Sequence, residues 1–288
     1  MKLYTVLIAS ALLTTLPATP SLAQDQPPTE AQQNARPPRN PAEGAEYSSA
    51  RKVADPVRRA EALEAFAKHY PSSDLKVDAL EWAVAAYQQA GNPTKVFDLA
   101  KRILEIEPQS VRAMAAYVAQ ARAMGDQGPD DARDMAMQGT LGLTAWQKPE
   151  EMTEEEYGRL RGEMTAVLTS AVGYYAMIGR DLGTARMYYQ QALMVNPMSL
   201  EDTYSLGLVE LEMQPLDPAG FWYIARAIHL AKSAKTGSEG FIANYARVKY
   251  ANFHGDMQGW DDIVKFAANQ TTIPDDFTVT QGTSPDNQ

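Results

Sequence analysis

The side chains that could do acid–base chemistry are scattered along this chain rather than set at the spacings that catalysis needs. Acidic residues occur in adjacent groups, at Glu154–Glu156, Asp261–Asp262 and Asp275–Asp276. Adjacent residues on a helix point apart, whereas a catalytic pair of carboxyl groups must face each other across the reacting bond. We therefore interpret these groups as solvated surfaces.

Metal-binding and nucleophile motifs are also missing from the sequence. The three histidines, His69, His229 and His254, lie far apart, and two of them fall at expected helix ends, where the helix dipole favours a cation. There is no H-E-x-x-H, no Gly-rich phosphate loop, no G-x-S-x-G and no acidic calcium loop. The sequence thus predicts a protein that is not an enzyme and needs no metal or cofactor.

Clustered aromatic residues are the remaining candidates for a binding site. They occur at Tyr174–Tyr175, Tyr188–Tyr189 and Phe221–Tyr223, and such rings can stack on sugars or peptides. At helical spacing, however, aromatic rings more often fill the space between helices. Tyr174 and Trp222 are left as candidates for surface contacts, so glycan recognition stays open as an alternative function.

Composition narrows the classes of partner. The chain has 288 residues, 45% of them hydrophobic, which is enough for a sizeable core. With 26 basic and 36 acidic residues its net charge is −10, so nucleic acids and anionic membrane surfaces are unsuitable partners. The absence of cysteine excludes a disulfide scaffold, a cysteine nucleophile and thiolate metal sites.

The first 23 residues have the features of a secretory signal peptide. Lys2 gives a positive start, Leu3–Leu16 an apolar stretch, and Ser21–Ala23 a small-x-small cleavage site. The apolar stretch is shorter than the ~20 residues that cross a bilayer, and no other stretch could span one. We expect a bacterial envelope protein, periplasmic or secreted, without a membrane segment after cleavage.

The two ends of the mature chain look unstructured. Residues 24–46 are rich in Pro, Gln and Ala and are predicted to form a disordered linker. Residues 270–288 are polar and are predicted to form a disordered tail, in which only Ile273, Phe277 and Val279 are expected to pack against the folded body. The folded domain is therefore expected to cover residues 47–269.

Within that domain the apolar residues recur at helical spacing, which predicts an all-α fold. Turn signals lie at Ala90–Pro93, Met124–Asp126, Ile178–Asp181 and His254–Asp256. In each of them a glycine is expected to take the left-handed conformation that ends a helix.

Three segments of the chain end alike: Tyr70–Ser73, Glu107–Ser110 and Asn196–Ser199. In each, a proline stops one helix and a serine two residues later is suited to cap the next. Pro71 and Pro108 are 37 residues apart, close to the period of ~34 residues of tetratricopeptide repeats.

Residues 166–197 resemble a tetratricopeptide repeat at most signature positions. Val172-Gly173 matches the Leu-Gly pair, Ala185 and Tyr189 match Ala-x-x-x-Phe, and Ala192 and Pro197 complete the unit. Weaker copies are expected at 77–108, 111–143 and 200–232, with an incomplete opening repeat at 60–70 and a divergent closing hairpin at 240–268. The resemblance implies a right-handed superhelical solenoid of antiparallel helix hairpins. The packing residues that it implies are Tyr87, Gly91, Pro108, Gly173, Ala185, Tyr189, Ala192, Pro197, Gly207, Ala219 and Tyr223.

The resemblance also implies a binding groove for a protein or peptide of unknown identity, lined by the first helix of each hairpin. The groove residues that it implies are Glu81, Gln88, Arg112, Arg122, Val167, Ser170, Tyr174, Met177, Glu201, Tyr204 and Leu208. The function implied is that of a non-enzymatic scaffold or adaptor in envelope assembly or secretion, and the sequence does not indicate an oligomeric state. One irregular stretch, 147–164, is expected to extend the first helix of the best repeat into solvent, starting at a capping box of Thr153 and Glu156.

Overall fold

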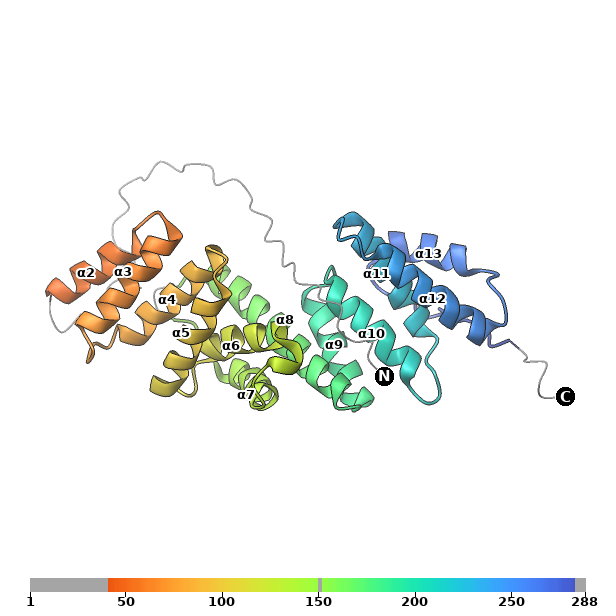
Figure 1. Ribbon diagram of the computed structural model, residues 1–288, viewed down its shortest axis with the longest axis horizontal. Helices are drawn as coiled ribbons and strands as arrows, with labels where there is room; N and C mark the ends of the chain where they lie inside the picture. The colour runs from red at the N-terminus through yellow and green to blue at the C-terminus, as the bar shows by residue number, and fades with distance from the viewer. Residues whose placement is uncertain (1–40, 150–151, 283–288) are drawn as a thin grey trace. The chain divides into compact units, whose positions relative to one another are not determined.

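The computed structural model describes residues 41–149 and 152–282, and within them every regular element is helical (Figure 1). The predicted signal peptide, 1–23, and most of the predicted linker lie outside the described residues. The helices are α2 (Pro41–Arg51), α3 (Pro56–His69), α4 (Lys76–Gln89), α5 (Pro93–Ile106), α6 (Val111–Ala123), η1 (Gly125–Gln127), α7 (Ala132–Ala145), α8 (Glu154–Ile178), α9 (Leu182–Val195), α10 (Leu200–Glu212), α11 (Ala219–Ser233), α12 (Glu239–His254) and α13 (Trp260–Asn269).

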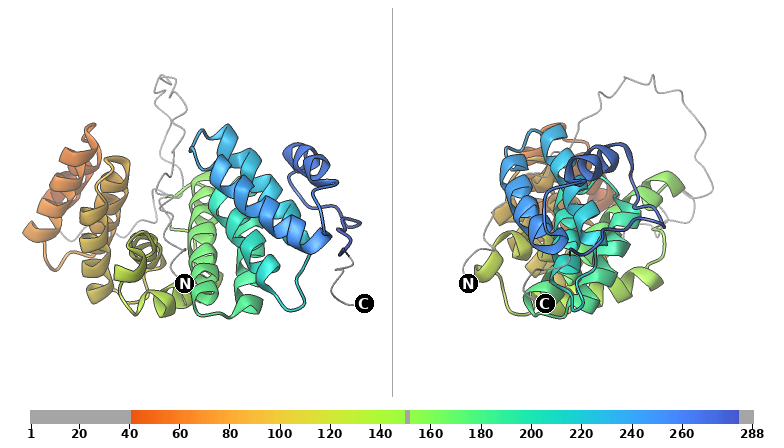
Figure 2. Two further views of the ribbon diagram at one scale, coloured as in Figure 1. Left: turned by 45° about the vertical axis from the view of Figure 1, so that its right-hand side comes forward. Right: turned by 90° about the vertical axis from the view of Figure 1, so that its right-hand side faces the viewer.

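The described residues divide into two compact units, with the boundary between Met164 and Thr165. In the first unit each helix from α2 to α7 packs against the next one along the chain, and α4 also touches α6. In the second unit α9 packs on α10 and α10 on α11, while α12 and α13 both pack on α11 (blue in Figure 2). This neighbour-by-neighbour packing confirms the prediction of an all-α stack of helix hairpins.

Helix starts follow the predicted capping chemistry. Ser110 and Ser199 each accept a hydrogen bond from the backbone N–H three residues later, at the starts of α6 and α10. The third serine, Ser73, does not cap a helix, because α4 begins at Lys76 without a side-chain cap. The Ser73 hydroxyl instead accepts from the Leu75 N–H and donates to Glu43.

Three of the four predicted turn glycines have positive φ angles, namely Gly91, Gly125 and Gly255. The prediction for the turn at Ile178–Asp181 was wrong, because there Arg180 takes the left-handed conformation, with φ at 63°. Two hydrogen bonds explain this: the Asp181 N–H reaches the Ala176 carbonyl just as the Asn92 N–H reaches that of Tyr87. Both turns need a left-handed residue at the same place, and Gly179 lies one position too early to supply it.

The predicted ends of the folded region need correction. Residues 41–46, assigned to the linker, are the first half of α2, and α2 with α3 makes a complete opening hairpin in place of the incomplete one expected at 60–70. At the other end Ile273, Phe277 and Val279 pack on the core beside α11 and α12, as expected. The tail is therefore placed on the body as far as Gly282, whose N–H donates to the Phe253 carbonyl.

The acidic stretch before the best repeat also packs more than expected. The predicted capping box forms, because the Thr153 N–H donates to Glu156 at 3.0 Å and the Glu156 N–H to the Thr153 hydroxyl at 3.2 Å. One turn later, however, the Tyr157 hydroxyl donates to the Trp146 carbonyl at 2.7 Å and the two rings lie 4.8 Å apart. The start of α8 is thus held against the segment that follows α7 and is not a free extension into solvent.

Glycines set the distance between paired helices in the second unit. A Cβ atom added to Gly173 of α8 would lie 3.0 Å from the ring of Tyr189 in α9. One added to Gly207 of α10 would lie 2.7 Å from Ile224 of α11. Ala185, Tyr189 and Ile224 are fully buried at these contacts, so the hairpin helices approach closely only where a side chain is absent.

Replacing Gly207 with alanine should therefore overpack the α10–α11 contact. We expect Gly207→Ala to lower the free energy of unfolding by about 1–3 kcal/mol, measured by denaturant unfolding followed by circular dichroism. Gly240→Ala is the matched control, because a Cβ there meets nothing within 4 Å and should stabilise by about 0.4–1 kcal/mol. Equal effects of the two substitutions would contradict this account of the packing.

Candidate functional site

In the first unit, two of the predicted groove residues pair with each other. Glu81 of α4 accepts from Nη1 of Arg112 in α6 at 2.6 Å and from the Ser110 hydroxyl at 2.7 Å. Burial raises the pKa of Glu81, and the facing Arg112 and Ser110 partly reverse that shift. Gln88 is exposed on α4, and Arg122 is half-buried on α6.

A similar contact joins α2 and α4, the first helices of two successive hairpins. The Tyr47 hydroxyl of α2 donates to the Asp78 carboxylate of α4. Trp82, also on α4, has the guanidinium of Arg51 4.2 Å from its ring centroid and that of Arg112 at 5.8 Å. Helices α2, α4 and α6 are therefore tied in series by polar and cation–π contacts.

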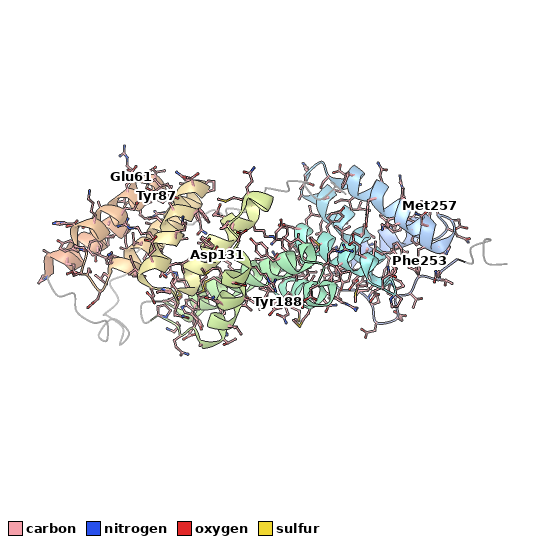
Figure 3. The ribbon with its side chains drawn as sticks, turned by 60° about the horizontal axis from the view of Figure 1, so that its bottom comes forward. Glu61, Tyr87, Asp131, Tyr188, Phe253 and Met257 are labelled. Atoms are coloured by element: carbon pink, nitrogen blue, oxygen red, sulfur yellow. The ribbon has the colours of Figure 1, made fainter. Side chains whose placement is uncertain are left out.

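Second helices of this unit are linked to first helices by tyrosines. Tyr87 of α4, labelled in Figure 3, is buried and donates to Glu64 of α3 at 2.8 Å. Tyr117 of α6 donates to Asp131, also labelled there, at 2.6 Å. Tyr87 therefore contributes both packing and a partly buried hydrogen bond.

In the second unit the predicted groove residues again contact neighbouring first helices. The buried Ser170 hydroxyl of α8 donates to buried Asp202 of α10, and Tyr204 of α10 sets its ring edge-on to that of Tyr245 in α12, 6.5 Å away. Leu208 is buried in the core. Val167, Tyr174 and Met177 are half-buried, and Glu201 is exposed.

We name these contacts between successive first helices the cross-ties: Tyr47–Asp78, Glu81–Arg112, Ser170–Asp202 and Tyr204–Tyr245. They occupy Glu81, Arg112, Ser170 and Tyr204, four of the residues predicted to contact a partner. Gln88, Tyr174, Met177 and Glu201 retain exposed surface on the same helices.

A double-mutant cycle on Glu81 and Arg112 measures the strength of one cross-tie. Because both side chains are about 15% exposed, alanine substitutions should show a coupling energy of about 0.5–3 kcal/mol. The exposed pair Arg159–Glu163 is the control and should couple by less than about 0.5 kcal/mol. Coupling at Glu81–Arg112 no larger than in the control would show that the pair does not hold the helices together.

Another feature of the second unit is a cavity of about 270 Å³. It lies between α9 and α11 and is closed on one side by the segment that follows α13. Its lining is mostly apolar, with a few polar groups, and includes Gln190, Leu193, Met194, Pro197, Thr203, Trp222, Tyr223, Arg226 and residues 271–273. Such a lining is typical of small-molecule sites.

Arg226 is a buried cation in the wall of this cavity, only 4% exposed. Its Nη1 donates to the carbonyls of Ala267 and Ala268, at the end of α13, at 3.3 and 3.2 Å. Its Nη2 lies 3.3 Å from the sulfur of Met198, and its Nε has no acceptor. Burial lowers the pKa of Arg226, and its hydrogen-bond partners among the described residues include no carboxylate.

Trp222 lies one helical turn before Arg226 and is 1% exposed. The prediction that its ring is available on the surface was therefore wrong, because the ring is part of the core around α11. Its Nε1–H has no acceptor within the described residues. The cavity wall thus contains two buried N–H groups, on Trp222 and Arg226, that lack a partner.

A second buried charge lies near the same wall. Glu210 of α10 is 1% exposed, and neither of its carboxylate oxygens accepts a hydrogen bond. The nearest cation is Nε of Arg186, at 3.4 Å, and Arg186 also donates to Asp217 at 2.8 Å. Burial, and then the charge of Asp217, raise the pKa of Glu210 to about 8, against the opposing effect of Arg186.

This carboxyl group also affects the cavity wall. Burial, and next the charge of Glu210, raise the pKa of the Tyr223 hydroxyl to about 12. A Glu210 carboxyl that keeps its proton at neutral pH carries no charge and can donate a hydrogen bond. The arrangement thus holds a proton on Glu210 beside the cavity, with the carboxylate of Asp217 engaged by Arg186.

The remaining candidates for chemistry stay separate. His69 pairs with Glu46, and His254 with Asp256, each at the end of its own helix. His229 lies within α11 near Ser233. Within the described ranges there is no group of three or more metal-binding side chains, and none of the helices there is long and apolar enough to cross a bilayer.

The cavity residues were missed at the level of sequence. The available signal was a charge inside an apolar helical run: Glu210 follows five buried residues, and Arg226 lies in the middle of α11, where most positions are buried. A charged residue at such a position is either paired or functional. The three histidines and the aromatic clusters do not point to these two charged residues.

No protein-family model matches this chain, and a search of curated proteins finds none that is similar to it. The fold alone therefore gives the class of protein, an all-α chain of packed helix hairpins. Membership of the tetratricopeptide family remains a prediction.

The raised pKa of Glu210 predicts a pH-dependent stability. The folded chain holds this proton up to about pH 8, whereas the unfolded chain releases it near about pH 4.3. The contribution of Glu210 to stability is therefore fully present below that lower pH and is lost as the pH rises to 8. Glu210→Gln should match the native chain in acid and exceed its free energy of unfolding above pH 8 by on the order of 2–4 kcal/mol.

Denaturant unfolding at a series of pH values tests this expectation. Glu201→Gln changes an exposed glutamate on the same helix and should leave the pH profile of stability unchanged. A Glu210→Gln profile parallel to that of the native chain would mean that Glu210 is ionised in the folded state.

Proposed function

We propose that this chain is a non-catalytic binding protein of the bacterial cell envelope that holds a protein or peptide partner on the first helices of its hairpins. The observation that carries the proposal is the set of cross-ties. They fix successive first helices relative to each other within each unit, so the exposed side chains between them form a surface that is rigid before a partner arrives. Preorganisation of this kind reduces the entropy lost on binding.

The faces of the two units differ in chemistry. In the first unit the surface near the cross-ties carries the exposed Gln88 and the partly exposed Asp78 and Trp82, which suits a polar segment. In the second unit it carries Val167, Tyr174 and Met177, which suits an apolar one. An extended peptide or a helix that presents such side chains is the kind of partner that each face fits.

The proposed export rests on the signal-like sequence of residues 1–23. An adaptor role in envelope assembly or secretion is part of the same proposal. The alternative, glycan recognition, depended on exposed Tyr174 and Trp222, and the burial of Trp222 counts against it.

Site-specific crosslinking in intact cells tests the proposal directly. A photo-crosslinking residue at Gln88 or at Glu201, both exposed on first helices, should capture one protein in high yield, identified by mass spectrometry. The same residue at Lys101 or Met187, exposed on second helices α5 and α9, is the matched control. Equal capture from both sets of positions, or capture from neither, would contradict binding on the first helices.

A loss-of-contact variant completes this test. Tyr174→Ala should reduce capture from Glu201, because Tyr174 is half-buried on the same face; circular dichroism monitors folding, since its ring also contacts that of Tyr175. Tyr204→Ala is less informative, since it also removes the contact with Tyr245. Undiminished capture in Tyr174→Ala would remove this residue from the binding face.

A further inference from the structure

Two N–H groups on residues that line the cavity between α9 and α11 lack an acceptor among the described residues. Nε of Arg226 and Nε1 of Trp222 lack acceptors, and Nη2 of Arg226 has only the thioether of Met198, which is a weak acceptor. Unsatisfied donors are uncommon in protein interiors. Two on adjacent turns of one helix, both on residues that line a cavity, are a second and independent sign of a binding site.

The charge of Arg226 is only partly balanced by the protein. The carbonyls of Ala267 and Ala268 belong to the last turn of α13, where the helix dipole places about half a negative charge. Both bonds use Nη1, so among the described residues the edge formed by Nε and Nη2 has no oxygen acceptor and meets only the sulfur of Met198, at Nη2. That edge presents two parallel N–H groups, the arrangement that a carboxylate accepts in bidentate fashion.

The remainder of the cavity indicates the rest of the ligand. Leu193, Met194, Pro197 and Ile273 supply apolar surface around the guanidinium. At about 270 Å³ the cavity lies just below the range of about 300–1,000 Å³ of drug-sized sites. The ligand that fits this shape is therefore small, with a short apolar body and one anionic end.

One wall of the cavity is suited to let such a ligand reach the covered N–H groups. Residues 271–273 follow the end of α13 and belong to no helix. Within the described parts of the chain, no hydrogen bond holds Thr271, Thr272 or Ile273. This wall is held by the packing of Ile273 on the core and by none of the described hydrogen bonds, whereas α9 and α11 are held by packing and by their own helical hydrogen bonds.

We propose that this cavity binds a small organic carboxylate, with its carboxylate on the Nε–Nη2 edge of Arg226 and its apolar body against Leu193, Met194 and Ile273. The Trp222 N–H adds a third donor to the anion. This site is separate from the first-helix faces, since its walls are α9, α11 and the segment after α13. The proposal of a carboxylate site therefore does not depend on the proposed protein partner.

Calorimetric titration of the full chain with hexanoate tests the proposal at neutral pH. Hexanoate should bind saturably, and hexanamide, which has the same shape without the charge, should bind at least about tenfold more weakly, as expected when a charge-assisted hydrogen bond is lost. Absence of saturable hexanoate binding at millimolar concentration, or equal affinity for hexanamide, overturns the proposal. So does binding confined to peptides with a free C-terminal carboxylate, which would point to a different ligand.

Two variants place the ligand in this cavity. Ile273→Trp fills the apolar end of the cavity and should abolish hexanoate binding. Arg226→Lys keeps the charge but loses the two-donor edge, so binding should weaken at least about tenfold. Circular dichroism monitors folding, since Arg226 also holds the end of α13. Met187→Ala, exposed on α9 and outside the cavity lining, should bind as the native chain does, and unchanged binding in Ile273→Trp contradicts this location.

Discussion

The close approach of two helices within a hairpin is the contact on which the second unit depends. At Gly173 and Gly207 the absence of a side chain lets Tyr189 and Ile224 come within about 3 Å of where a Cβ atom would lie. This spacing sets the position of α9 against α8 and of α11 against α10. Since the cavity lies between α9 and α11, the same small residues determine how far apart its walls stand.

The cross-ties add a second constraint of a different kind. Three of them join side chains about 30 residues apart in sequence, such as Tyr47–Asp78 and Ser170–Asp202, and the fourth, Tyr204–Tyr245, spans about 40. Packing alone gives a stack of hairpins some freedom to twist, whereas a hydrogen bond between neighbouring first helices requires one relative position. The residues that a repeat protein would use to contact a partner are here partly devoted to holding its own shape.

Buried charge distinguishes the region around α11. Glu210 and Arg226 each lie in an apolar helix, and neither has a partner of opposite charge in good hydrogen-bonding geometry. Burying a charge without a partner costs free energy, because the charge loses its interactions with water. Glu210 avoids part of the cost by keeping its proton, which an arginine does not do, and Arg226 instead relies on the carbonyls that end α13.

The sequence by itself determined the all-α class, most of the helix boundaries and two of the three serine caps, because helical periodicity and capping chemistry are local properties. It also pointed to Gly173, Gly207 and Tyr189, since small and aromatic residues at these repeat positions commonly pack the two helices of a hairpin against each other. It did not reveal Arg180 in the left-handed position, because backbone hydrogen bonds over five residues decided that, nor the first half of α2, whose weak apolar pattern resembles a linker.

Only the tertiary structure decided what the candidate site contains. Whether Glu81 and Ser170 face a partner or a neighbouring helix depends on side chains about 30 residues away, and no local pattern encodes that choice. The cavity needs α9, α11 and residues 271–273 in one place, and these come together only through packing on the core. The burial of Trp222 and Arg226 follows from that packing, which is why a surface role was predicted for Trp222 and none for Arg226.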